Sequence, residues 1–302
     1  MIALGKDPKF VTHFVRKLRG GSQPILAQAN DGLLYVVKFA NNLQGPNLLF
    51  NESAGSELYR ACGLPVPEWT PLWVSDPFLD GNPDCWIQTE AGCLRPASGL
   101  CFGSRFLGGN DKRLFEILPG FMFKRVRNQS NFWLAWLIDV CAEHVDNRQA
   151  IFVEDAEGWL DAYFIDQGHL LGGPNSDCKR YFGASRYLDQ RIYGQVSSET
   201  LLDFQSVLHA LDADTLRERI EAIPAEWSQA SAREGFERCL QRLKMASLVQ
   251  HVVETIISDL ERRAETESGI FRSEGKFAFE VLRPCVHRGG GVRRFAHHPN
   301  CA

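Results

Sequence analysis

Residues 144–169 read HVDNRQAIFVEDAEGWLDAYFIDQGH and hold two aspartates, Asp146 and Asp166, twenty positions apart. Ala150–Val153 and Ala162–Ile165 are short apolar runs around a polar, glycine-containing turn, which predicts a β-hairpin that brings both aspartates to one side. Phosphoryl transfer uses such a pair, because one carboxylate orients the proton of the nucleophile and the other holds the magnesium that bridges the nucleotide phosphates. Taken singly, either aspartate is equally well explained as a solvated turn residue.

The composition predicts a globular protein with one large domain or two lobes, because 302 residues can bury a sizeable core. Lysine and arginine number 33 and aspartate and glutamate 37, so the net charge is −4 and nucleic acid is not expected as a direct partner. No apolar run reaches the roughly 18 to 20 residues of a membrane span, and the first residues lack the core of a signal peptide. We therefore expect a cytoplasmic protein without a membrane anchor.

The cysteine pattern agrees with that compartment. Nine cysteines are scattered along the chain, none of them in a C-x-x-C motif, and several lie inside apolar runs. Such residues are typical of reduced core cysteines, and a disulfide framework is not expected.

The character of the sequence changes near residue 108, from strand-like runs and turns to helical periodicity. Ile25–Ala29 and Leu33–Phe39 flank Asn30-Asp31-Gly32, and a glycine after Asn or Asp is a strong hairpin signal. The predicted fold class is α+β, with a β-rich N-lobe, a helical C-lobe and a cleft between them. We assign residues 1–107 to the N-lobe, 108–264 to the C-lobe and 265–302 to a C-terminal tail.

Other elements follow from periodicity and from helix start and stop signals. Further strands are predicted at Glu68–Val74, Cys85–Thr89 and Gly99–Phe106. Helices are predicted at Asn47–Cys62, Lys112–Ile117, Ser130–Glu143, Ser198–Leu211, Asp214–Ile223 and Ser231–Arg263. Gly63 should end the first of these helices, and Ser231 with Glu234 should form a capping box at the start of the last.

Three features of the N-lobe are typical of a phosphate site. Gly20 and Gly21 permit the close backbone approach with which N–H groups cradle phosphates, although a flexible turn is the commoner use of two glycines. Lys38 ends a strand after this loop, where its ammonium can reach the phosphates of a nucleotide. A carboxylate from the next helix should position Lys38, and Glu52 is the first candidate, with Glu57 as a replacement.

Seven short segments stand out in chain order: Gly20-Gly21-Ser22-Gln23, Tyr35-Val36-Val37-Lys38-Phe39 followed by Asn41-Asn42, Asn51-Glu52, Gly63-Leu64-Pro65-Val66-Pro67, Phe102-Gly103-Ser104-Arg105-Phe106, Asp146-Asn147-Arg148-Gln149-Ala150-Ile151-Phe152 and Ile165-Asp166-Gln167-Gly168. In this order they resemble the motifs of HipA-like kinases, which are related to the HipA toxin kinase and, more distantly, to lipid kinases of the phosphoinositide type. The resemblance runs from about residue 10 to residue 260.

The resemblance implies a two-lobed protein-kinase-like fold with ATP and magnesium in the cleft. It implies that Lys38 contacts phosphates and pairs with Glu52. It implies a phosphate loop made of Gly20, Gly21 and Ser22, and a hinge that receives adenine, made of Ser104, Arg105 and Phe106.

In the C-lobe, the resemblance implies that Asp146 is the catalytic base and Asp166 the magnesium ligand. The chain departs from the family at Ile151, where an asparagine usually binds a second metal ion. Isoleucine cannot bind magnesium, which takes oxygen ligands. Gln149, or less favourably Asn147, would have to supply an amide oxygen instead.

The sequence leaves several alternatives open. The leading function is an ATP-dependent phosphotransferase with an alcohol acceptor, and the others are a nucleotide-binding pseudokinase that acts through a partner and a small-molecule or lipid kinase. An antitoxin-like partner chain is possible on the resemblance alone. His144 and His169 are expected to orient their loops or to assist proton transfer, and Arg148 either binds a phosphate or clamps the loop. In the tail, metal-ligand residue types occur without the spacing of a zinc module; they are Cys285, His287, His297, His298 and Cys301.

Overall fold

A computed structural model of the chain describes residues 9–109, 112–176, 185–194 and 196–270. The chain divides into two compact units, residues 1–254 and 255–302, and everything below concerns the first unit unless stated. The tail residues with metal-ligand side chains lie outside the described residues. Within the described part, no helix is both long and apolar enough to cross a bilayer.

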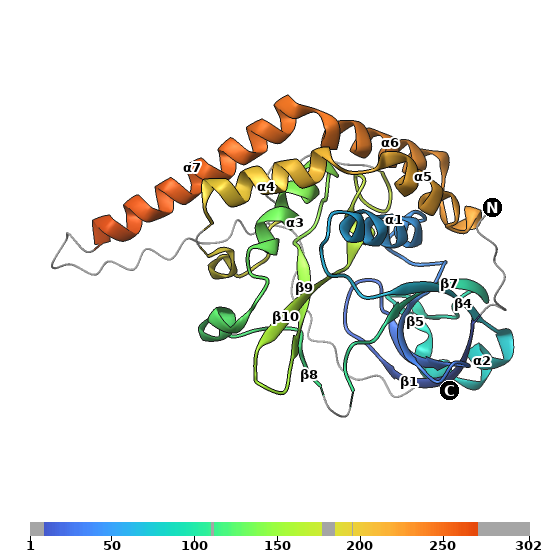
Figure 1. The fold of residues 1–302 in the computed structure, drawn as a ribbon. Coiled ribbons are helices and arrows are strands. Elements are labelled where there is room, and N and C mark those ends of the chain that lie inside the picture. Colours follow the sequence, from blue (N-terminus) through green and yellow to red (C-terminus); the bar gives the residue numbers. More distant parts are fainter. Residues whose placement is uncertain (1–8, 110–111, 177–184, 195, 271–302) are drawn as a thin grey trace. The chain divides into compact units, whose positions relative to one another are not determined.

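The N-terminal part folds into a closed five-stranded barrel (Figure 1). Its strands, in order around the barrel, are β1 (Lys9–Lys17), β2 (Ile25–Ala29), β3 (Leu34–Lys38), β7 (Gly99–Arg105) and β4 (Trp69–Val74). Neighbours pair antiparallel except β1 and β4, whose parallel pairing closes the barrel. The predicted β2–β3 hairpin and the predicted strands at β4 and β7 are confirmed, whereas β1 was not predicted.

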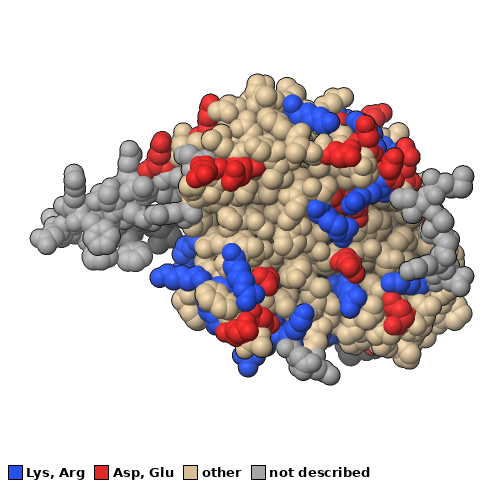
Figure 2. Space-filling model, in the orientation of Figure 1, with Lys and Arg blue, Asp and Glu red and all other residues tan. Residues whose placement is uncertain are grey.

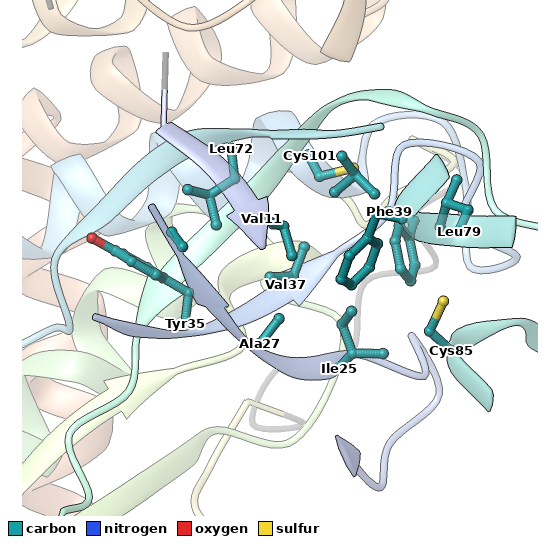
Figure 3. Close-up of a cluster of buried hydrophobic side chains, with 13 residues drawn as sticks. Val11, Ile25, Ala27, Tyr35, Val37, Phe39, Leu72, Leu79, Cys85 and Cys101 are labelled. Atoms are coloured by element: carbon teal, nitrogen blue, oxygen red, sulfur yellow. The ribbon is translucent and has the colours of Figure 1, made fainter. Parts of the chain in front are cut away.

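The interior of the barrel is a compact apolar cluster (Figure 3). Alternate residues of each strand point inward, as the two-residue period of a strand requires, so Ile25 and Ala27 of β2 meet Val37 of β3. Phe39, just beyond β3, is fully buried in the same cluster. The buried residues Val37 and Phe39 fix the end of β3. This matters for the site because Lys38 lies between them.

One helix lies at the centre of the unit. This is α1 (Leu48–Ala61), and every residue from Leu48 to Tyr59 is buried. Figure 1 shows α1 between the barrel and the helices α5 (Ala213–Glu221) and α6 (Ala230–Lys244). The predicted stop at Gly63 is confirmed: its φ is +77°, and the N–H groups of Gly63 and Leu64 donate to the carbonyls of Arg60 and Tyr59 in a Schellman motif.

The C-terminal half of the unit contains a three-stranded antiparallel sheet next to α3 (Asn131–Cys141). The sheet has the order β10 (Leu160–Ile165), β9 (Gln149–Glu154) and β8 (Arg113–Phe115), and its β9–β10 hairpin and α3 confirm the predictions there. The predicted helix at Lys112–Ile117 is wrong. Residues 113–115 are β8, because pairing with β9 outweighs the weak local preference of so short a segment.

The remaining helices are α4 (Ser198–His209), α5, α6 and α7 (Ala246–Ile270), of which α4 and α5 were predicted. The single helix expected from Ser231 to Arg263 is wrong, because Met245 takes an extended conformation that separates α6 from α7. The expected capping box is also wrong: α6 begins at Ala230, its N-cap makes no side-chain hydrogen bond, and Ser231 is already inside the helix.

The other elements are short and connect the larger ones. They are the helix α2 (Asp76–Gly81), the strands β5 (Ile87–Thr89) and β6 (Gly92–Leu94), and the 3-10 helices η1 (Pro83–Cys85), η2 (Gly120–Arg125), η3 (Gln167–His169), η4 (Gln190–Tyr193) and η5 (Ala225–Trp227). The strand predicted at Cys85–Thr89 is therefore confirmed for its last three residues.

Most of the described cysteines match the expectation of reduced core residues. The free and buried ones are Cys62, Cys85, Cys101, Cys141 and Cys239. Cys93, which lies exposed in β6, is an exception because it is disulfide-bonded.

Charges are mixed on the face of the molecule that Figure 2 shows. Lysine and arginine side chains are interspersed with aspartate and glutamate, and no broad stripe of one sign is visible. This face therefore offers no concentrated positive surface that would attract a polyanion by charge alone.

The close packing of α1 gives a stability prediction at Gly55. Alanine normally stabilises a helix interior over glycine by about 1 kcal/mol, but a Cβ at Gly55 would lie 2.5 Å from Cβ of Gln167 and from Cδ1 of Leu170. We expect Gly55→Ala to lower the free energy of unfolding by about 1–3 kcal/mol, measured by urea denaturation. Gly81→Ala is the control, because no atom lies within 4 Å of its added Cβ, and it should change stability by less than about 0.5 kcal/mol. Equal stability of the two variants would contradict the close contact.

Candidate functional site

The site is organised around the ammonium group of Lys38, the last residue of β3. Nζ of Lys38 donates to Oε1 of Glu52 in α1 and, at 2.8 Å, to Oδ1 of Asp166, which follows β10. Three elements far apart in the sequence therefore meet at one buried charge, since Lys38 and Asp166 are 128 positions apart. The predicted pair of Lys38 and Glu52 is present in the structure.

Burial and the neighbouring charges shift the pKa of each of the three groups in this cluster. Burial alone would lower the pKa of Lys38, but the carboxylates of Asp166 and Glu52 outweigh it and hold that pKa above its usual range. Burial alone would raise the pKa of Asp166, but the ammonium of Lys38 holds it well below the usual range. Burial raises the pKa of Glu52 despite the same ammonium, because its side chain is almost completely removed from water.

Helix α1 also holds the backbone that follows Asp166. Oε1 of Glu52 accepts a hydrogen bond of 3.0 Å from the N–H of Gly168, and Nδ2 of Asn51 donates to the carbonyls of Gly168 and Leu170 at 3.0 and 2.9 Å. A Cβ at Gly168 would lie 2.8 Å from that same carboxylate oxygen, so glycine is required for this approach. Asn51 was not among the predicted site residues.

Glu57, the alternative partner of Lys38, has a structural role instead. Its Oε1 accepts a hydrogen bond of 2.8 Å from the indole of Trp69, and its Oε2 lies 3.3 Å from Nη1 of Arg219. These contacts tie α1 to β4 and α5.

Asp166 has an unusual backbone, with φ of +61° and ψ of +56°. A non-glycine residue in this left-handed region costs about 1–3 kcal/mol and commonly marks a functional position. Its second carboxylate oxygen, Oδ2, accepts a hydrogen bond of 2.6 Å from Nε2 of Gln149. The pairing of Gln149 with Ile165 in the β9–β10 register explains why the amide lies beside Asp166.

Asp146 lies in the loop after α3 and faces the same cavity. The N–H of Val145 donates to the carbonyl of His169 at 3.0 Å, which joins this loop to the loop of Asp166. Oδ1 of Asp146 accepts a hydrogen bond of 2.7 Å from the N–H of Asn147, and Oδ2 has no partner among the described residues. The β9–β10 hairpin thus brings the two aspartates to one cavity, as the sequence predicted.

Arg148 clamps the loop, which settles the two roles left open for it. Its guanidinium is fully buried and binds Asp139 of α3 in a bidentate pair of 2.9 and 2.8 Å. Nη1 donates to the carbonyl of Ile165 at 3.0 Å, immediately before Asp166. Arg148 is near the cavity, but its guanidinium is buried and bonded within the protein, which favours the clamping role.

The predicted phosphate loop is a tight turn between β1 and β2. Gly20 has a φ of +133°, and the N–H of Gln23 donates to the Gly20 carbonyl at 3.1 Å. Asn42, in the connection between β3 and α1, donates through Nδ2 to the carbonyl of Ser22 at 2.8 Å.

The predicted hinge consists of the last two residues of β7, Ser104 and Arg105, and of Phe106, which follows the strand. The N–H of Arg105 donates to the carbonyl of Glu68 at 2.7 Å, and that of Phe106 donates to the carbonyl of Leu34 at 2.9 Å. Both donors are therefore used within the protein. The next residue, Leu107, also lines the cavity, and its N–H has no partner among the described residues.

One cavity of 890 Å³ connects these features. Its lining includes all eleven predicted site residues: Gly20, Gly21, Ser22, Lys38, Glu52, Ser104, Arg105, Phe106, Asp146, Gln149 and Asp166. It also includes residues that were not predicted, notably Gln44 and the segment from Tyr187 to Arg191. Contacts of Gln44 and of that segment depend on tertiary structure, and no local motif indicates them.

The side chains fit a magnesium ion that arrives with a nucleotide. Among the described residues, no group of three or more His, Cys, Asp or Glu side chains could hold a metal ion. Asp166 and Asp146 are the carboxylates at the cavity, and magnesium is commonly bound by one or two carboxylates together with substrate phosphates. Ile151 lines the cavity without an oxygen atom, and Gln149 directs its amide nitrogen at Asp166. The expectation that Gln149 offers its oxygen to the metal is therefore not met by this arrangement.

Comparison with solved structures identifies the architecture. The crystal structure of the Helicobacter pylori proinflammatory kinase CtkA matches with a TM-score of 0.50 and 14% identity, covering 82% of this chain and 95% of that one. The chain has a protein-kinase-like fold. Structures of the Golgi casein kinase, one of them with Mn/ADP bound, match with TM-scores of 0.46 and 0.45 at 13% and 15% identity; they cover 84% of this chain and 75% and 73% of theirs. No protein-family model and no curated protein sequence matches the chain.

His144 gives a pH prediction that is independent of any ligand. Its ring is buried, and neither nitrogen has a hydrogen-bond partner among the described residues. Burial, followed by the nearby guanidinium of Arg148, lowers the pKa of His144 well below its usual value. In the unfolded chain, His144 takes up a proton near pH 6.5, whereas in the folded protein it stays neutral there. The contribution of His144 to the free energy of unfolding is therefore fully present above that pH and is lost as the pH falls below it.

We expect the free energy of unfolding to drop by about 1.4 kcal/mol between pH 7.5 and 5.5 through His144 alone. Urea denaturation of the wild type and of His144→Gln at both values measures this, because the other titrating groups are common to both proteins. The same pH dependence in the two proteins would refute the assignment to His144.

Proposed function

We propose that this protein is an ATP-dependent phosphotransferase that transfers phosphate to an alcohol group. The observation that carries the proposal is the buried Lys38 ammonium, held between Glu52 and Asp166 at a cavity that Asp146 also lines. A structural ion pair alone needs no cavity of 890 Å³ beside it. Kinase chemistry needs this combination: a cation on the phosphates, a carboxylate for the metal and a second carboxylate for the acceptor.

We infer one orientation for the nucleotide from the residues that line the cavity. Adenine would lie against the residues after β7, where Leu107 offers the N–H that Arg105 and Phe106 do not. The phosphates would then extend under the turn of Gly20 to Ser22 and reach Lys38. Val36, Phe102 and Ile151 line the cavity with apolar side chains suited to the flat face of a base.

Three side chains would carry the transfer. Asp146 has one carboxylate oxygen without a partner in the described parts of the chain, and this oxygen can accept the proton of an acceptor hydroxyl. Lys38 stabilises the charge on the phosphates, while Glu52 keeps its ammonium in place. Asp166 would hold the magnesium ion that arrives with the nucleotide, which would supply positive charge against the charge that develops on the transferred group.

A second candidate is a nucleotide-binding pseudokinase. Two observations favour it: Ile151 stands where HipA-like kinases are expected to carry a metal-binding asparagine, and Oδ2 of Asp166 is already bonded to the amide of Gln149. Both would weaken metal binding without blocking the nucleotide.

An assay with labelled ATP and magnesium tests the proposal on wild type, Asp146→Ala, Asp166→Ala and a control, Asp203→Ala, whose side chain is exposed on α4. We expect wild type and control to transfer or incorporate label equally. Asp146→Ala should lower the rate at least about a hundredfold and keep the nucleotide-induced rise in Tm. Asp166→Ala should lose the part of that rise that requires magnesium.

The outcomes separate the two candidates. Nucleotide-dependent stabilisation of wild type without any transfer supports the pseudokinase and excludes the phosphotransferase. No stabilisation by nucleotide at all, at millimolar ATP and magnesium, excludes both.

A gain-of-function variant tests the altered metal site. Ile151→Asn places an amide oxygen on the cavity wall, and we expect the magnesium concentration for half-maximal activity to fall by about tenfold. Ile151→Leu serves as the control because it keeps an apolar side chain of the same size. An unchanged magnesium requirement in Ile151→Asn would show that the missing asparagine does not limit the site.

A further inference from the structure

The connection between β3 and α1 carries one side chain that lies between the phosphate loop and the loop of Asp166. This residue is Gln44. Its Nε2 lies 3.2 Å from Nε2 of His169, three positions after Asp166. On the other side, the three atoms nearest to a Cβ built on Gly21 all belong to Gln44, the closest being Nε2 at 2.7 Å. The amide therefore touches both loops that would enclose the phosphates.

The backbone of Gln44 is fixed on both sides as well. Its N–H donates to Oδ1 of Asn42 at 2.9 Å, and Nδ2 of the same Asn42 donates to the carbonyl of Ser22. Its carbonyl accepts a hydrogen bond of 2.9 Å from Nδ2 of Asn175. The backbone at Gln44 is thus connected to the phosphate loop through Asn42 and to the segment after Asp166 through Asn175.

Within the described part of the chain, the side-chain amide of Gln44 lacks a hydrogen bond that would stabilise its oxygen in a buried position. Oε1 of Gln44 is buried and has no hydrogen-bond partner among the described residues. An unpaired buried polar atom is unfavourable, and native proteins usually retain one for a reason other than stability. Leucine or methionine would fill the same space without this cost.

We propose that Gln44 is a positioning residue that sets the distance between the phosphate loop and the loop of Asp166. This inference rests on the proposed nucleotide site. Gln44 touches neither Lys38 nor Asp146 through any hydrogen bond in the described part, so its effect passes through the position of Gly21 and His169. Loss of the amide should leave the phosphate loop free to move away and should weaken nucleotide binding, with little effect on the transfer step itself.

A double-variant cycle tests the contact. Gly21 does not have a positive φ, so alanine is allowed there by the backbone, and its Cβ would displace the end of the Gln44 side chain. We expect Gln44→Ala and Gly21→Ala each to raise the KM for ATP and the dissociation constant of ADP by about five- to tenfold, with kcat within about threefold of wild type. The double variant should be no worse than either single one, because both remove the same contact.

Gln250→Ala is the matched control, since Gln250 is an exposed glutamine on α7 that bonds only to Glu254 in the described part, and it should match wild type. Additive effects of Gly21→Ala and Gln44→Ala, or an unchanged dissociation constant in Gln44→Ala, would overturn the inference. ADP binding is measured by calorimetry and needs no turnover, so the cycle is informative even for a pseudokinase. Absence of ADP binding to wild type would instead refute the proposed function.

Discussion

The charge of Lys38 is the constraint on which the rest of the site depends. An ammonium group removed from water costs several kcal/mol unless charged partners replace its hydration. With both carboxylates ionised, Glu52 and Asp166 bring the formal charge of the cluster to 1 − 2 = −1. The N–H of Gly168 and the amide of Gln149 offset part of this excess, at 3.0 and 2.6 Å. The remaining negative charge is what a metal ion bound to nucleotide phosphates would meet.

Helix α1 makes this cluster rigid. A helix buried on all faces cannot move without exposing its apolar residues, and the side chains of Asn51 and Glu57 tie it to the segment after Asp166 and to α5. Its contact with η3 is so close that Gly55 and Gly168 have no room for a Cβ. The pairing of Lys38 with Glu52 is therefore part of the folded core, and the free protein already holds it.

The sequence predicted best those features that local chemistry determines. A glycine after Asn-Asp fixed the β2–β3 hairpin, Gly63 ended α1, and two apolar runs around a turn gave β9 and β10 with the aspartates at their ends. The errors arise where contacts with residues distant in the sequence determine the secondary structure. Residues 113–115 are a strand because β9 lies next to them, and Ser231 is inside α6 because the chain enters the helix before it.

The same distinction applies within the site. Each residue expected from a motif lines the cavity, but the contacts of Gln44 and the enclosure of Arg148 come from segments more than 100 residues away or on other helices. Gln149 shows most clearly that residue type alone does not determine the role of a side chain. Its residue type permits an oxygen ligand, yet the register of β9 with β10 directs its nitrogen to Oδ2 of Asp166.

That contact bears directly on the proposed metal site. Asp166 is held in a left-handed conformation, and both of its oxygens are bonded, one to Lys38 and the other to Gln149. Each oxygen still has a lone pair that a metal ion could use, but an ion bound closely there would compete with one of these hydrogen bonds. Lys38 is buried and charged, whereas Gln149 is exposed, neutral and at the start of its strand, so its hydrogen bond is the weaker of the two. The amide of Gln149 is thus the group that would move aside more easily for a metal ion at Asp166, and under the proposed function this movement would favour metal binding and transfer.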